Sequence, residues 1–129
     1  MARRMQIGEV AERTGLSLRT IRYYDEVGLV VPSARSQGGF RLYTEPDIDR
    51  LGTVQRMKPL NLPLEEMREL LDLLDAAAGH RVGGGCLGAA GRRRLQEFAD
   101  RVEDRCRRLR GEVAAAEDGV AALRSRLPA

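Results

Sequence analysis

The chain has 129 residues, of which 43% are hydrophobic and 32% are charged, and its formal net charge is +3. This length suffices for one small domain with an extended element and excludes a large enzyme core. Its five aromatic residues, two Phe and three Tyr, are too few for an all-β core, and no segment approaches the ~18 consecutive apolar residues of a membrane-spanning helix.

Positive charge is concentrated in the N-terminal half of the chain. Residues 1–58 contain ten Lys and Arg against seven Asp and Glu, whereas residues 59–129 contain twelve of each. The abundance of Arg is itself typical of a GC-rich genome, so the positions of these residues tell more than their number. The electrostatic preference for phosphate therefore lies in the first half.

Two short helices joined by a glycine turn are expected first, at about residues 7–13 and 17–27. Gly15 supplies the turn, because a residue without a Cβ adopts positive φ without strain. Ser17 is a natural N-cap for the second helix. This spacing is typical of a helix-turn-helix, which lays its second helix in the DNA major groove.

The second helix has one face suited to packing and one suited to DNA. Leu18 and Ile21 can face the first helix, with Tyr24 as a further candidate. The outward face then carries Arg and Tyr instead of the Lys and Glu usual on a solvated surface, at Arg19, Thr20, Arg22 and Tyr23.

A β-hairpin is expected next. Two β-prone segments, 29–31 and 40–43, flank the glycines of Gln37-Gly38-Gly39. A helix-turn-helix followed by such a hairpin is a winged helix.

Two further helices follow. Thr44 and Pro46 begin a third helix that runs to about Met57, where Pro59 stops it. A fourth helix is expected at about 64–74, and glycines punctuate residues 79–91 as in a loop or hinge.

The segment from about 92 to 127 predicts one long helix with an apolar seam. Its spacing alternates between three and four residues as in a coiled coil, except for two consecutive steps of four between Phe98 and Cys106. Such a helix cannot bury its seam on so small a domain, so the simplest partner is a second copy of the chain. We expect the dimer interface to comprise Leu95, Phe98, Val102, Cys106, Leu109, Val113, Val120 and Leu123, with Ala116 and Leu127 continuing the pattern.

Segments 7–11, 17–29, 39–43, 47–51 and 63–71 together closely resemble the MerR family of bacterial transcription regulators. The resemblance implies a mainly α fold: a winged helix-turn-helix DNA-binding domain at 1–75, a glycine-rich hinge at 76–91 and a C-terminal dimerisation helix at 92–129. The helices would pair as an antiparallel coiled coil. The homodimer would bind double-stranded promoter DNA and distort the spacer between promoter elements, so that RNA polymerase can engage both.

The expected DNA contacts come from the second helix, the hairpin and the turn after the third helix. Arginine can chelate a guanine or clamp a phosphate, and the sequence leaves open whether Arg19 or Arg22 touches a base. Arg41 and Tyr43 match phosphate-contacting positions of the family, whereas Phe40 could equally pack against the domain. The complete predicted set is Ser17, Arg19, Thr20, Arg22, Tyr23, Arg35, Phe40, Arg41, Tyr43 and Lys58.

No catalytic group or cofactor site is predicted. The glycine-rich segment has no nucleotide-binding motif, and His80, Cys86 and Cys106 lack the spacing of a metal site. Cys86 is the more plausible sensing thiol, because Cys106 lies on the apolar seam. Since no signal peptide follows Arg3 and Arg4, we expect a cytoplasmic protein. We also expect that it is not an enzyme. The sequence does not identify an effector.

Two other functional classes remain open. The same winged fold serves DNA-architectural and recombination-directionality proteins, which bend DNA without acting on transcription. The long helix could instead capture a partner protein such as a sigma factor.

Overall fold

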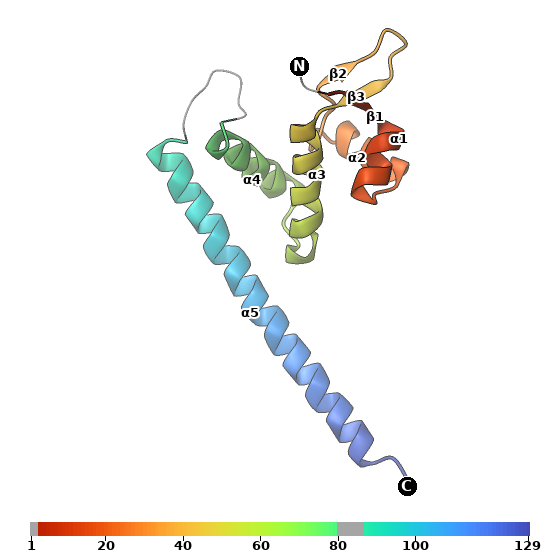
Figure 1. Cartoon of the computed structure of the whole chain (residues 1–129). Coiled ribbons are helices and arrows are strands. Elements are labelled where there is room, and N and C mark those ends of the chain that lie inside the picture. The colour runs from red at the N-terminus through yellow and green to blue at the C-terminus, as the bar shows by residue number, and fades with distance from the viewer. Residues whose placement is uncertain (1–2, 80–86) are drawn as a thin grey trace. The chain divides into compact units, whose positions relative to one another are not determined.

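The computed structural model describes residues 3–79 and 87–129, which form two compact units divided between Leu87 and Gly88 (Figure 1). The fold is mainly helical, as the sequence predicted. The first unit contains helices α1 (Ile7–Thr14), α2 (Leu18–Glu26), α3 (Glu45–Met57) and α4 (Leu64–Ala77), the 3₁₀ turn η1 (Lys58–Leu60), and strands β1 (Met5–Gln6), β2 (Ala34–Arg35) and β3 (Arg41–Tyr43). The second unit is the helix α5 (Ala89–Ser125). No helix in the described ranges is long and apolar enough to cross a membrane.

The predicted helix-turn-helix is confirmed in both helices and in its turn. Gly15 ends α1 in the left-handed conformation, with φ of 75°, and its N–H donates to the Ala11 carbonyl. Ser17 caps α2: its Oγ accepts from the backbone N–H of Thr20 at 3.1 Å. The turn and the cap together set where the second helix begins.

The hairpin exists, but its first strand was predicted in the wrong place. The strands pair in the order β1-β3-β2, with Ala34 opposite Leu42 and Met5 opposite Tyr43. The expected strand at 29–31 is absent, because the N–H groups of Leu29 and Val30 both donate to the Tyr24 carbonyl at the end of α2. Those residues therefore close the helix and enter the core instead of joining a sheet.

Helix α3 begins with a capping box, as the residues Thr44 and Pro46 indicated. The Asp47 carboxylate accepts from the Thr44 N–H at 2.9 Å and from the Ser33 hydroxyl at 2.6 Å. The carboxylate thus links the segment before the hairpin to the start of α3. Pro59 does not end the helical conformation abruptly, because it lies within the 3₁₀ turn η1. After this turn, Asn61 adopts the left-handed conformation.

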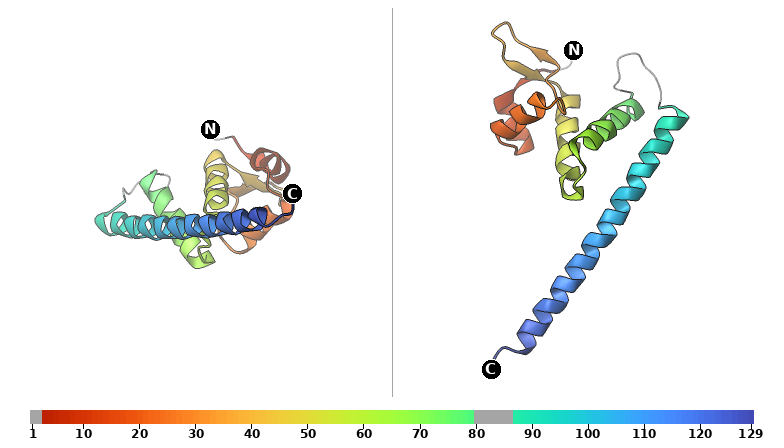
Figure 2. Two further views of the ribbon diagram at one scale, coloured as in Figure 1. Left: turned by 90° about the horizontal axis from the view of Figure 1, so that it is seen from below. Right: turned by 180° about the vertical axis from the view of Figure 1, so that it is seen from behind.

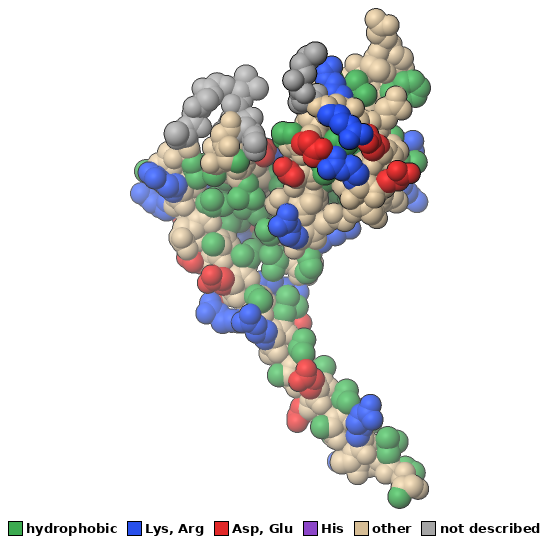
Figure 3. Space-filling model, in the orientation of Figure 1, with side chains coloured by type: hydrophobic (Ala, Val, Ile, Leu, Met, Phe, Trp, Pro, Cys, Tyr) green, Lys and Arg blue, Asp and Glu red, His purple; other side chains and the backbone are tan. Residues whose placement is uncertain are grey.

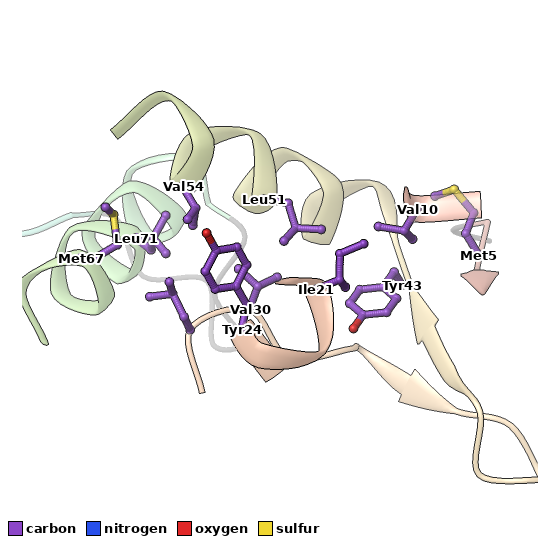
Figure 4. Packing of buried hydrophobic residues seen from close by; sticks show 11 residues of the cluster. Met5, Val10, Ile21, Tyr24, Val30, Tyr43, Leu51, Val54, Met67 and Leu71 are labelled. Carbon is purple, nitrogen blue, oxygen red and sulfur yellow. The ribbon is translucent and has the colours of Figure 1, made fainter. Parts of the chain in front are cut away.

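One hydrophobic core unites α1, α2, α3, α4 and the sheet (Figure 4). Ile21 and Tyr24 of α2 lie in it, whereas Leu18, which was predicted to pack against α1, is exposed. The buried members are Met5, Val10, Ile21, Tyr24, Leu29, Val30, Tyr43, Leu51, Val54, Met67 and Leu71.

Two arginines from neighbouring helices hold the chain just after α2. Arg50 of α3 donates through Nε to the Leu29 carbonyl at 2.9 Å and forms ion pairs with Asp72 and Asp75 of α4. Arg68 of α4 donates to the Val27 carbonyl. These contacts fix the C-terminal end of α2 relative to α3 and α4.

Helix α5 comprises 37 residues, and its ribbon is continuous in both views of Figure 2. It begins three residues before the predicted start and α4 continues three residues beyond its predicted end, so both helices extend into the segment assigned to the hinge. The Phe98 ring lies against the guanidinium groups of Arg94 and Arg101, at 4.5 and 5.8 Å from its centroid. Figure 3 shows hydrophobic side chains recurring along α5, and the exposed ones include Val113, Val120, Leu123 and Leu127.

Leu51→Ala should lower the free energy of unfolding by about 2–5 kcal/mol, because it empties a fully buried position between α3 and the rest of the core. Urea unfolding followed by circular dichroism, at a fixed protein concentration, measures this loss. The matched control is Leu18→Ala, which removes the same atoms from an exposed site and should change stability by less than about 0.5 kcal/mol. Equal losses in the two variants would contradict this description of the core.

Candidate nucleic-acid interface

The outward face of α2 carries the side chains that the sequence predicted for DNA contact. Arg19, Arg22 and Tyr23 are exposed on the side opposite to the buried Ile21 and Tyr24. Because the buried pair is fixed in the core, the exposed face cannot rotate about the helix axis. The result is a rigid, basic and aromatic helix face of the kind that enters a major groove.

Lys58 lies next to this face although more than thirty residues separate it from α2 in the sequence. Arg19, Thr20, Tyr23, Tyr24 and Lys58 line one open hollow of about 370 Å³. Lys58 is exposed at the start of η1. The structure thus brings the predicted lysine next to α2, with Pro59 following it in η1.

The hairpin presents Phe40 and two arginines. Phe40 is 63% exposed, so it does not pack against the domain, and Ser36 holds its backbone: the Phe40 N–H donates to Ser36 Oγ at 3.1 Å, and the Ser36 N–H donates to the Phe40 carbonyl at 2.9 Å. Arg35 and Arg41 stand opposite each other on β2 and β3. The hairpin therefore combines an exposed aromatic ring with two cations.

Asp25 of α2 contacts two residues of the candidate interface and was not among the residues that the sequence predicted. Its Oδ2 accepts from Arg41 Nε at 2.7 Å and from an Arg35 terminal nitrogen at 3.1 Å. The hydrogen bond to Asp25 raises the pKa of Arg41 above its ordinary value. The signal in the sequence was a pair of acids, Asp25 and Glu26, at the end of a helix whose other charged residues are arginines.

Tyr43 does not belong to the DNA-contacting surface, and its prediction was wrong. Its side chain is completely buried in the core, since its position on β3 faces the helices (Figure 4). Its hydroxyl has no hydrogen-bond partner among the described residues. Burial raises the pKa of Tyr43.

Only some of the side chains considered as metal ligands lie in the described part of the chain. Residues 3–79 and 87–129 contain no group of three or more His, Cys, Asp or Glu arranged to hold a metal ion. His80 and Cys86 lie outside the described residues, and Cys106 has a free thiol on α5.

The comparison with protein families decides the classification. The sequence model of the MerR HTH family regulatory proteins matches residues 5–74, which run from β1 into α4 and include the whole candidate interface. The chain belongs to the MerR family. Its curated relatives in this family are transcription regulators and not enzymes, which agrees with the sequence prediction.

MerR-family relatives are similar over different lengths. The transcriptional activator TipA of Streptomyces coelicolor is 44% identical over 75 residues, covering 58% of this chain and 29% of TipA. The chain spans between 26% and 56% of the length of the curated relatives that it matches.

Solved MerR-family structures match nearly the whole chain. The regulator PbrR691 of Ralstonia metallidurans CH34, solved with lead(II), is 30% identical with a TM-score of 0.58, covering 97% of this chain and 88% of PbrR691. HiNmlR, a MerR-family regulator lacking the sensor domain and solved on promoter DNA, has a TM-score of 0.72 at 18% identity, covering 95% and 89% of the two chains. The second similarity shows a shared fold.

Tyr43→Phe should leave stability at neutral pH unchanged or raise it by up to about 1 kcal/mol, because it removes a buried hydroxyl that has no partner. Ionised Tyr43 is disfavoured in the fold, so stability is present below the unfolded pKa of about 10 and falls as the pH rises above it. The phenylalanine variant should therefore lose less stability than the wild type in alkaline solution. Urea titrations at neutral and alkaline pH test this, and a destabilised variant at neutral pH would mean that the hydroxyl is bonded.

Proposed function

We propose that this protein is a transcription regulator that binds promoter DNA as a homodimer and distorts the spacer between promoter elements. The main support for this proposal is the fixed, exposed face of α2, which presents Arg19, Arg22 and Tyr23 beside Lys58. Packing places these cations on one surface, and within residues 3–79 no ion pair neutralises Arg19, Arg22 or Lys58. Double-stranded DNA complements that surface, because its phosphates are negatively charged and its major groove is wide enough to admit a helix.

The interface divides into base contacts and phosphate contacts. Arg19 and Arg22 lie on α2, where a guanidinium can chelate the O6 and N7 atoms of guanine. Arg41 lies on the hairpin and uses only Nε for Asp25, so its terminal nitrogens remain able to donate to a phosphate. Phosphate contacts fix the position of the domain, and contacts from α2 select the sequence.

Dimerisation through α5 is supported by its apolar side chains. At 1.5 Å per residue the 37 residues of α5 extend about 55 Å. The exposed Val113, Val120 and Leu123 continue the heptad pattern toward its C-terminal end. A second copy of α5, running antiparallel, buries this seam and supplies two DNA-binding units that match a two-fold symmetric site.

Action on transcription is supported by family membership. TipA is named a transcriptional activator, and HiNmlR was solved on promoter DNA. By extension, the dimer of this chain would bend and untwist the promoter spacer, so that RNA polymerase meets both promoter elements in register. Deformation of DNA at bases that the protein does not touch carries part of this selectivity.

Arg22→Ala should weaken binding to a duplex that the wild type selects from a random-sequence library, by about 1–3 kcal/mol for each protomer that loses a bidentate base contact. The reason is its exposed position in the middle of α2. Fluorescence anisotropy with the selected duplex measures the affinity. The control is Arg108→Ala, which removes an exposed arginine from α5 and should leave the affinity near that of the wild type. Equal affinities of the two variants would rule out base reading by Arg22.

Helix polarity is tested by cross-linking in a background that carries Cys86→Ala and Cys106→Ala. Leu95→Cys and Val120→Cys lie at nearly equal distances from the two ends of α5. An antiparallel pair places position 95 of one protomer near position 120 of its partner. A short bismaleimide should then join a mixture of the two variants, as judged by denaturing gel, and should join neither variant to itself. Cross-linking of the Leu95→Cys variant alone would indicate a parallel pair.

A further inference from the structure

We propose that Asp25 is a positioning residue that holds the hairpin against the recognition helix and, by occupying Arg35 and Arg41, restrains their attraction for DNA of any sequence. This inference rests on the proposed DNA-binding function. It assigns to one carboxylate a contribution to the discrimination between specific and non-specific sites.

The location of Asp25 is unfavourable for an acid unless it has such a role. It lies in the last turn of α2, where the helix dipole disfavours negative charge. A carboxylate among residues that meet DNA also repels phosphates. Its side chain is only 12% exposed, so it is largely withdrawn from solvent. The two arginine contacts are what offset these costs.

The Asp25 carboxylate also stabilises the two arginines, because it reduces the repulsion between them. Arg35 and Arg41 are paired directly across β2 and β3, where like charges destabilise a hairpin. Asp25 Oδ2 accepts hydrogen bonds from Arg35 at 3.1 Å and from Arg41 at 2.7 Å. The negative charge of the carboxylate thus lies between the two guanidinium groups and offsets their repulsion.

The contacts continue from Asp25 to the end of the hairpin. The second terminal nitrogen of Arg35 donates to the Gly39 carbonyl at 3.3 Å, and Gly39 precedes the exposed Phe40. A chain of polar contacts thus runs from the end of α2 through Arg35 to the loop that carries Phe40. Moving the carboxylate would release the hairpin from the helix that reads the bases.

Two consequences follow for DNA binding. With Asp25 present, the cluster of one acid and two arginines carries a net charge of +1, and the guanidinium groups are oriented. Without the carboxylate, both arginines are free to meet phosphates in many arrangements. Non-specific affinity should rise, and the geometry that favours one site should be lost.

The test compares Asp25→Asn with Glu26→Gln, measured on two duplexes of equal length and composition. One duplex is selected by the wild type from a random library, and the other is a shuffled sequence. Glu26 is exposed, adjacent to Asp25 and of equal charge, so its variant reports the effect of net charge alone. Thermal unfolding by circular dichroism checks that each variant folds, and Asp25→Ser is a second neutral variant in case Asn is not tolerated.

Asp25→Asn should bind the shuffled duplex about two- to fivefold more tightly per protomer, with a steeper dependence of log affinity on log salt, by up to about 0.9 per added phosphate contact. Its ratio of specific to non-specific affinity should fall, and Glu26→Gln should change both quantities less. Adding Arg41→Gln to Asp25→Asn should remove the gain, because the released guanidinium produces it.

Two outcomes would overturn the proposal in distinguishable ways. If the wild type selects a sequence but Asp25→Asn behaves as Glu26→Gln does, or binds the shuffled duplex less tightly than the wild type, the role of Asp25 is refuted and the proposed function stands. If the wild type enriches no sequence from the library, the proposed function fails and this inference fails with it.

Discussion

The burial of Ile21 and Tyr24 is the constraint on which the rest of the first unit depends. A nine-residue helix has little stability of its own, so α2 exists because these two side chains fill the core beneath it. Their burial also fixes the rotation of the helix. Arg22 and Tyr23 therefore point outward as a consequence of packing, and no separate device is needed to present them.

Fixing the far end of α2 requires polar contacts, because a helix terminus leaves carbonyl groups unpaired. Arg68 donates to the Val27 carbonyl and Arg50 to the Leu29 carbonyl. Arg50 also pairs with acids on α4, so the position of the recognition helix is connected to α3 and α4 together. Any movement of α4 would consequently shift the C-terminal end of α2, the helix proposed to read DNA.

Local signals made most helices predictable. Gly15, Ser17 and Thr44 each act through their own backbone geometry or the next turn, so their roles follow from the sequence and hold in the structure. The strand predicted at Leu29 and Val30 failed because β-branched and aliphatic residues suit a strand and a buried loop equally. Only the tertiary structure shows that their N–H groups are used at the end of α2.

The candidate site was harder to predict, because exposure and pairing are tertiary properties. Tyr43 and Arg41 are two residues apart on one strand, yet the first is buried and the second half-buried beside an acid from α2. The resemblance to the family could not separate them, since it matches residue types and does not report how deeply each side chain is buried. Asp25 escaped notice because its partners are ten and sixteen residues away.

The two units place different demands on their surroundings. The first unit buries its apolar residues within itself and leaves a basic face outward, so its folding does not need the DNA that we propose it binds. Helix α5 retains exposed Val113, Val120, Leu123 and Leu127, and an isolated helix cannot cover its own seam. Assembly would therefore satisfy the helix first and bring two preformed recognition surfaces together. In the proposed dimer, the spacing between the two surfaces would be set by α5, whereas the fit of each surface to a groove would be set by the core beneath α2 and by the carboxylate of Asp25.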